Sequence, residues 1–262
     1  MKLNHMITFF LGLALLFAEE TSAVAGPVVL FDEAHAQQFL VGKQGPLDLS
    51  GLAKLFSEQG AEIRTGTTPI SENSLLGVDA LIISGAFTPL VDSEIEAILA
   101  FLARGGKVAL MTHIPTPYMA LATRLGVSIS NAVLLEQENL VGANAQDFMV
   151  KDFTVHPLTT GIKSFAVYGG WALLERSKAA VSIARTSPWA WVDLNKNGKQ
   201  EEGDAMQVFS VILAGKVGKG DFVILGDDAI FQNRFLKDGN YSLAKNLAIW
   251  FCEWRELSSV QP

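Results

Sequence analysis

Short runs of hydrophobic residues recur through the first half of the chain and are bounded by polar residues or glycine. Continuous runs of this kind are typical of strands that are buried on both faces of a parallel sheet. We therefore predict strands at residues 28–31, 79–83 and 107–111, and a further strand at residues 61–64.

The intervals between these runs carry apolar residues at helical spacing. Residues 49–59 repeat leucine or phenylalanine every three or four positions, which predicts a helix. A second helix is predicted to begin at Asp92 or Ser93, because Ser93 and Glu96 fit a capping box. A third covers residues 118–125. This alternation predicts a parallel sheet with helices on both faces.

The second half of the chain has shorter apolar segments and more turns. Short strands are predicted at residues 166–174, 180–184 and 190–192. Residues 206–213 and 221–225 flank a glycine-rich turn and predict a hairpin, and residues 241–257 predict a closing amphipathic helix. The sequence therefore predicts one α/β domain over residues 26–262, mostly parallel, with an antiparallel elaboration in its C-terminal half.

The N-terminus has the layout of a secretory signal peptide. Lys2 precedes a short apolar run at residues 6–18, and small residues at Ala23 and Ala25 suit cleavage before Gly26. The run is shorter than the ~20 residues of a spanning helix. We therefore expect a mature protein that begins near Gly26, lies in the periplasm or outside the cell, and has no membrane span after cleavage; an uncleaved anchor is the alternative.

Composition excludes several classes of protein. The chain is 49% hydrophobic and 18% charged, which excludes intrinsic disorder. Its net charge of −7, without a cluster of lysine or arginine, argues against a nucleic-acid partner. Cys252 is the single cysteine, so an internal disulfide is excluded, and its apolar neighbours predict a buried residue.

Polar residues follow four of the predicted strands. Ligands of open α/β sheets bind outside the carboxyl ends of the strands, where these residues would share one edge. Histidines and carboxylates gathered there could bind a metal or perform acid–base chemistry, or they could simply cap helices and loops. The candidate cleft residues are Asp32, Glu33, His35, Gln37, Ser84, Thr112, His113, Asp227, Asp228 and Asn233.

The segment 193–204 carries oxygen-bearing side chains at the spacing of an EF-hand-type calcium loop, with Gly198 at its sixth position. The predicted Ca²⁺ ligands are Asp193, Asn195, Asn197, Lys199, Glu201 and Asp204. Because Asp204 replaces the usual glutamate and two ligands are amides, we expect a weak structural site, with a Kd on the order of 10⁻⁴–10⁻³ M. A plain Asn-Gly hairpin turn is the alternative.

Four strings, at residues 29–35, 79–85, 156–162 and 225–228, occur in a familiar order. Together they resemble class I glutamine amidotransferase-like domains of unknown function in bacterial envelope proteins. Those domains are similar to the one shared by gliding-motility and intraflagellar-transport proteins. The resemblance implies a flavodoxin-like fold. Amidotransferase chemistry needs a cysteine on the turn after a central strand, and Thr112 and His113 follow the strand here, so we expect no such activity.

Two hypotheses for the function remain open. The first is a non-catalytic periplasmic module that binds a small molecule, a glycan or an envelope protein. The second is a metal-assisted hydrolase that uses the carboxylates and histidines of the predicted cleft. Glycine-rich nucleotide-binding motifs are absent, so we expect no nucleotide cofactor.

Overall fold

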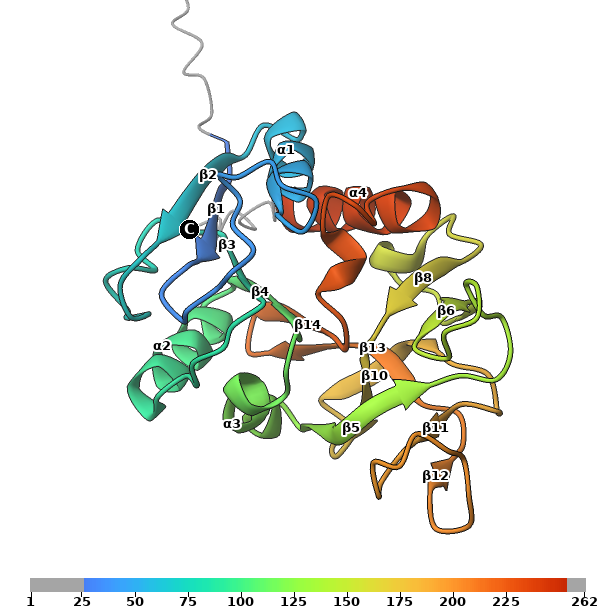
Figure 1. Ribbon diagram of the computed structural model, residues 1–262. Helices are drawn as coiled ribbons and strands as arrows, with labels where there is room; N and C mark the ends of the chain where they lie inside the picture. Colours follow the sequence, from blue (N-terminus) through green and yellow to red (C-terminus); the bar gives the residue numbers. More distant parts are fainter. Residues whose placement is uncertain (1–25, 254–262) are drawn as a thin grey trace, which may run out of the picture.

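The computed structural model describes residues 26–253, which form a twelve-stranded mixed sheet, a two-stranded ribbon and four α-helices (Figure 1). The predicted signal peptide, residues 1–25, lies outside the described residues. The strands are β1 (Val28–Asp32), β2 (Glu62–Gly66), β3 (Ala80–Ser84), β4 (Lys107–Met111), β5 (Val127–Leu135), β6 (Asp147–Val150), β7 (Asp152–Phe153), β8 (Phe165–Tyr168), β9 (Trp171–Glu175), β10 (Ala180–Arg185), β11 (Trp191–Val192), β12 (Ala205–Met206), β13 (Ser210–Val217) and β14 (Gly220–Leu225). The helices are α1 (Ser50–Glu58), α2 (Asp92–Ala103), α3 (Met119–Arg124) and α4 (Asp238–Cys252), with 3-10 turns η1 (Thr116–Tyr118), η2 (Pro157–Thr159) and η3 (Ala229–Phe231).

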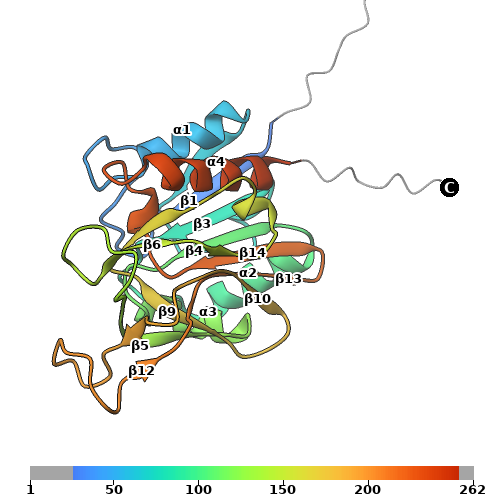
Figure 2. The ribbon, with the colours of Figure 1, turned by 90° about the vertical axis from the view of Figure 1, so that its right-hand side faces the viewer.

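One half of the sheet is parallel, in the order β2-β1-β3-β4-β14. Strands β1, β3 and β4 are buried at every position, as their continuous apolar runs predicted. Helices α1 and α4 pack on one face of the sheet, where Leu52 and Leu247 belong to one buried cluster (Figure 2). Helices α2 and α3 contribute Ile98 and Leu121 to a second buried cluster.

The other half of the sheet is antiparallel. Strand β13 pairs with β14 in the predicted hairpin and also with β10 and β9, and β5 and β11 continue the sheet beyond β9. The expectation of a flavodoxin-like, mostly parallel sheet with helices on both faces is therefore wrong: the sheet is mixed and strands outnumber helices. The antiparallel pairs β5–β9, β9–β13 and β10–β13 join strands that are not consecutive in the chain, so the local sequence pattern did not reveal how far the antiparallel part extends.

Strand β5 is a strand that the sequence pattern did not reveal. Its burial alternates along the chain instead of running continuously, because the strand lies near one end of the sheet and exposes Asn131.

The predicted capping box of α2 was wrong in its residues. The main-chain N–H of Val91 donates to Glu94 at 3.0 Å, so Glu94 and not Glu96 closes the first turn of α2.

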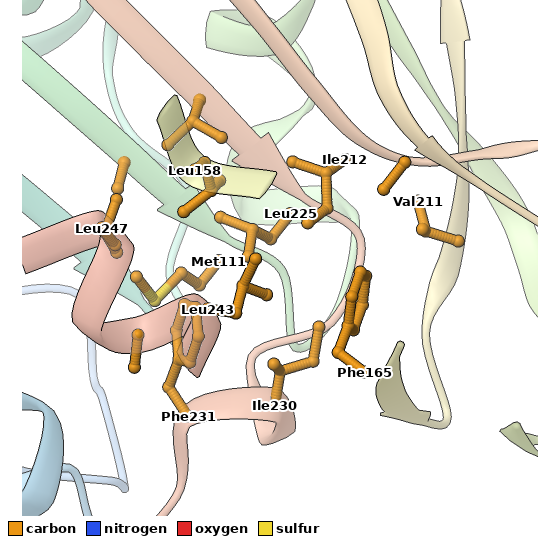
Figure 3. Close-up of a cluster of buried hydrophobic side chains, with 14 of the residues drawn as sticks. Met111, Leu158, Phe165, Val211, Ile212, Leu225, Ile230, Phe231, Leu243 and Leu247 are labelled. Atoms are coloured by element: carbon orange, nitrogen blue, oxygen red, sulfur yellow. The ribbon is translucent and has the colours of Figure 1, made fainter. Parts of the chain in front are cut away.

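The core between α4 and the central strands is continuous (Figure 3). Met111 of β4 and Leu225 of β14 lie against Leu243 and Leu247 of α4 and belong to one buried cluster. Cys252 ends α4 in the same cluster, as predicted, and burial raises the pKa of its thiol to about 11. A thiol of this kind is a packing residue rather than a nucleophile.

A buried lysine anchors the end of α4 to the sheet. The Nζ of Lys107, at the start of β4, donates to the carbonyl oxygens of Trp250 at 2.5 Å and Glu253 at 3.1 Å. Carbonyl groups at a helix C-terminus lack partners within the helix and carry partial negative charge. Lys107 therefore caps α4 with a charge-assisted contact.

Over residues 26–253, no helix has the length and apolar content that a membrane crossing needs.

Candidate functional site

The carboxyl ends of β1, β3, β4 and β14 meet at one edge of the sheet. The parallel register sets Phe31 beside Ile82, Ser84 beside Met111, and Met111 beside Leu225. The polar residues that follow these strands are therefore gathered at this edge, which we call the carboxyl edge. They separate into two hydrogen-bonded groups, one around His35 and one around His113.

The first group is a buried network of Asp32, His35 and Glu94. His35 Nδ1 lies 2.7 Å from Asp32 Oδ2, and its Nε2 lies 3.1 Å from a Glu94 carboxylate oxygen. Gln37 completes the network: its Nε2 donates to Asp32, and its Oε1 accepts from the His35 main-chain N–H at 2.7 Å. Asp32 Oδ1 also accepts from the N–H of Ala34 at 3.2 Å.

The charge state of His35 follows from these contacts. Burial alone would lower the pKa of His35, but the hydrogen bonds and charges of Asp32 and Glu94 outweigh it and raise that pKa. Both ring nitrogens face carboxylate oxygens, and only the imidazolium donates from both. The pKa of Glu94 is lowered, because hydrogen bonds from Val91, Ile70 and His35 outweigh its burial.

Glu94 was missing from the residues that the sequence pointed to. It lies on the first turn of α2, 59 positions from His35, and the sequence pattern placed it only at the start of a predicted helix. The signal that could have revealed it is weak: a glutamate near a helix N-terminus is expected to bond main-chain N–H groups. Its second role, as the partner of a histidine, depends on tertiary packing.

Three further candidates fulfil structural roles. Asn233 accepts from the N–H of Gly51 at 2.8 Å and donates to the carbonyl of Gly45 at 2.8 Å, which ties the start of α1 to the segment after η3. Asp227 accepts from the N–H groups of Tyr168 at 2.6 Å and Ala229 at 2.8 Å. Glu33 accepts from the N–H of Val41 at 3.3 Å.

The second group centres on His113, which follows β4. Its Nδ1 lies 3.1 Å from Asp228 Oδ1, and its side chain is 36% exposed while that of Asp228 is 2% exposed. The rings of Phe39 and Phe87 flank the imidazole at centroid distances of 5.2 and 5.1 Å. The hydrogen bond to Asp228 raises the pKa of His113 despite partial burial. The His113 imidazole is therefore oriented by Asp228, flanked by two aromatic rings, and partly exposed at the carboxyl edge.

Three buried polar atoms at the carboxyl edge lack hydrogen-bond partners within residues 26–253. In the described part of the chain these atoms are Ser84 Oγ, Thr112 Oγ1 and Asp228 Oδ2, at or just after the ends of β3, β4 and β14. Buried polar groups in native proteins are almost always hydrogen-bonded, so each of these atoms needs an explanation. Gly85, with φ of +62°, leaves the space: a Cβ there would stand 3.0 Å from Asp228 Oδ2.

The neighbouring carboxyl group of Asp227 is electrostatically unusual. Burial, followed by the charge of Asp228, raises the pKa of Asp227 to about 8, although two main-chain N–H groups and His113 act in the opposite direction. Two adjacent buried carboxyl groups disfavour double ionisation. The charge of a protonated His113 favours ionisation of Asp227, but burial and the charge of Asp228 outweigh it.

The two histidines do not form a shared metal site. Both ring nitrogens of His35 are used by Asp32 and Glu94, whereas His113 pairs with Asp228. Across residues 26–253, the structure brings together no group of three or more His, Cys, Asp or Glu side chains able to hold a metal ion. Metal binding at His35 would require breaking its buried network.

The predicted calcium loop lies between β11 and β12. Asp193 Oδ1 accepts from the N–H of Asn197 at 3.1 Å, and its Oδ2 accepts from that of Gly198 at 2.7 Å. Gly198 has φ of +74°, as a sharp turn at the sixth position needs. Asn195 Nδ2 donates to Glu201 at 2.5 Å. The loop is closed by its own hydrogen bonds, and calcium binding stays a prediction.

The other predicted ligands also take part in this loop. Asn197 Oδ1 accepts from the N–H of Lys199 at 2.8 Å. The carboxylate of Asp204 accepts from the N–H groups of Leu194 at 3.1 Å and Glu201 at 3.0 Å. The six predicted positions are therefore linked within a single turn-rich segment.

Comparison with known proteins identifies the family. Residues 44–248 match the family described as Domain of unknown function (DUF4350), and the chain belongs to that family. The resemblance to class I glutamine amidotransferase-like domains was therefore wrong as a family assignment: the match is to a different family, and the solved relatives share the fold alone. A search of curated proteins found no match.

Solved structures with the same fold are distant in sequence. The N-terminal domain of mmIFT52 has a TM-score of 0.70 at 16% identity, covering 86% of this chain and 98% of that one. A ThuA-like protein from Bacteroides uniformis ATCC 8492 has a TM-score of 0.55 at 14% identity, covering 89% and 94%. A cytoplasmic protein from Salmonella typhimurium LT2 has a TM-score of 0.55 at 14% identity, covering 87% and 100%.

Proposed function

We propose that the protein is a non-catalytic binding module that holds a small polar ligand at the carboxyl edge, against His113. In keeping with the predicted signal peptide, the module would act in the periplasm or outside the cell. Glycans and envelope proteins remain possible partners of the same module, and the loop 193–204 would bind Ca²⁺ as a structural ion.

The state of His113 carries the proposal. Within residues 26–253 its Nε2 has no hydrogen-bond partner, while its Nδ1 is held by the buried Asp228. An imidazole fixed in this way presents one ring nitrogen to a ligand without losing further conformational entropy. The flanking rings of Phe39 and Phe87 add apolar contact area around this polar point.

The remaining polar residues of the edge support binding rather than hydrolysis. Asp32, His35 and Gln37 are committed to one another, and Asp227 and Asn233 hold main-chain segments. Metal-assisted hydrolysis is the alternative, and it would need several of these groups to turn away from their present partners. Ser84, Thr112 and Asp228 retain unused hydrogen-bonding atoms at the same edge.

Small-molecule capture provides the test. The immobilised protein and its His113→Ala variant would be incubated with a small-molecule extract of the cell envelope, and bound compounds would be identified by mass spectrometry. We expect compounds that the wild-type protein retains and His113→Ala loses, with weaker retention by Asp228→Asn. If wild type and His113→Ala retain the same compounds in equal amounts, the proposal is refuted.

A further inference from the structure

A cavity of about 370 Å³ lies beside the antiparallel half of the sheet, between β5, β9 and the loop 193–204. Its volume is within the range of ~300–1,000 Å³ that is usual for small-molecule sites. The cavity lies beside an irregularity in β5. The pairing of β5 with β9 is regular as far as Ile129, is interrupted, and resumes at Val133. Irregularities of this kind often stand beside binding sites, because they redirect side chains.

The polar side chains that line this cavity have unused hydrogen-bonding groups. Within the described chain, the side chains of Asn131, Gln146 and Lys196 make no hydrogen bond and no ion pair. Asp193 also lines the cavity, but both of its carboxylate oxygens accept main-chain N–H groups, from Asn197 and Gly198. Lys196 is therefore the one cationic side chain among the residues that line the cavity, and the Asp193 carboxylate is turned toward the N–H groups of its own loop.

Apolar side chains from β5 and β9 line part of the cavity. Val133 and Leu135 project from β5, and the half-buried indole of Trp171 lies beside them on β9. Trp171 Nε1 donates to the main-chain carbonyl of His113 at 2.9 Å, which fixes the plane of the ring. A fixed indole favours stacking with a second planar ring.

We propose that this cavity binds a small aromatic carboxylate, with the ring against Trp171, Val133 and Leu135 and the carboxylate at Lys196. Asn131 and Gln146 would bond a polar substituent on the ring. The site is separate from the imidazole of His113, so this inference goes beyond the proposed function. A ligand without a planar apolar face would leave the indole unused, and a neutral ligand would leave Lys196 unpaired.

Titration with 4-hydroxybenzoate, followed by NMR of the methyl groups, tests the proposal. We expect shifts at Val133 and Leu135, and weaker binding of both the neutral analogue 4-hydroxybenzamide and glucuronate, which has the charge without the flat apolar face. Lys196→Gln should weaken 4-hydroxybenzoate binding by about fivefold, the scale of one exposed ion pair. Lys178→Gln, at an exposed lysine outside the cavity, should leave it unchanged.

Several outcomes would overturn the proposal. These are the absence of shifts at Val133 and Leu135 at millimolar 4-hydroxybenzoate, equal affinity in Lys196→Gln and Lys178→Gln, or tighter binding of glucuronate, which would indicate a saccharide site. The His113→Ala variant separates this site from the one at the carboxyl edge. It keeps the main-chain carbonyl that holds Trp171, so 4-hydroxybenzoate binding should persist there even if capture at His113 fails.

Discussion

Replacing Glu94 by glutamine removes one carboxylate from the buried network of Asp32, His35 and Glu94 without changing the volume of the side chain. The Glu94 carboxylate accepts three hydrogen bonds, from the N–H of Ile70 at 2.8 Å, from that of Val91 at 3.0 Å, and from His35 Nε2 at 3.2 Å. A glutamine has one acceptor oxygen, and its NH₂ group must then face at least one of these donors.

The cost can be worked out from these contacts. A hydrogen bond to a charged group contributes about 1.5–3 kcal/mol, and an opposed donor is left unsatisfied in the interior. Removing one partner of a buried ion pair typically costs about 3–5 kcal/mol, because the other charge stays buried. We therefore expect Glu94→Gln to lower the free energy of unfolding by about 3–5 kcal/mol. Urea denaturation with an unchanged m-value would measure this loss.

Glu96→Gln is the matched control. Glu96 lies two residues further along α2 and pairs with Arg124 at 2.6 Å, but the two side chains are 62% and 51% exposed. Exposed pairs of this kind contribute little to stability, so the denaturation midpoint should barely change. Equal losses of stability in Glu94→Gln and Glu96→Gln would show that the buried network contributes nothing beyond a surface contact.

The same network predicts how stability depends on pH. The raised pKa of His35 contributes stability that is present below about pH 6.5 and is lost as the pH rises through the folded-state pKa. The lowered pKa of Glu94 contributes stability that is present above about pH 4.3 and is lost as the pH falls through its folded-state pKa. Urea midpoints measured from pH 3 to 9 should vary less in Glu94→Gln, and an unaltered profile would contradict this reasoning.

Three further predictions concern other parts of the molecule. Asn240→Ala should lower the free energy of unfolding by about 2–4 kcal/mol, because Asn240 bonds both main-chain groups of Ala166, whereas Ser242→Ala on the exposed side of α4 should cost little. Millimolar Ca²⁺ should raise the melting temperature, with the increase reduced in Asp193→Asn; an unchanged melting temperature would refute the calcium loop. Cys252 should react with a thiol reagent only on unfolding, and rapid labelling of the native protein would contradict its buried position.

The central parallel strands could be predicted because a strand that is buried on both faces consists mainly of consecutive apolar residues. Strands β1, β3 and β4 are apolar at nearly every position, and no polar alternation obscures them. Strand β5 could not be predicted in this way, because its sequence alternates between buried and partly exposed residues and includes serine and asparagine. The extent of the antiparallel half, and with it the class of the sheet, depends on pairings between strands that are distant in the chain.

The sequence by itself determined which polar residues stand at the ends of the central strands, since strand ends follow from the end of each apolar run. The sequence did not determine which of these residues keep a polar atom without a hydrogen-bond partner in the folded protein. His35 is committed to Glu94 and His113 to Asp228, partners 59 and 115 positions away. Only the tertiary structure decided this division, because a buried polar group must find its hydrogen bonds among whatever side chains packing brings beside it. Packing left His113, rather than His35, with a ring nitrogen that has no hydrogen-bond partner within residues 26–253.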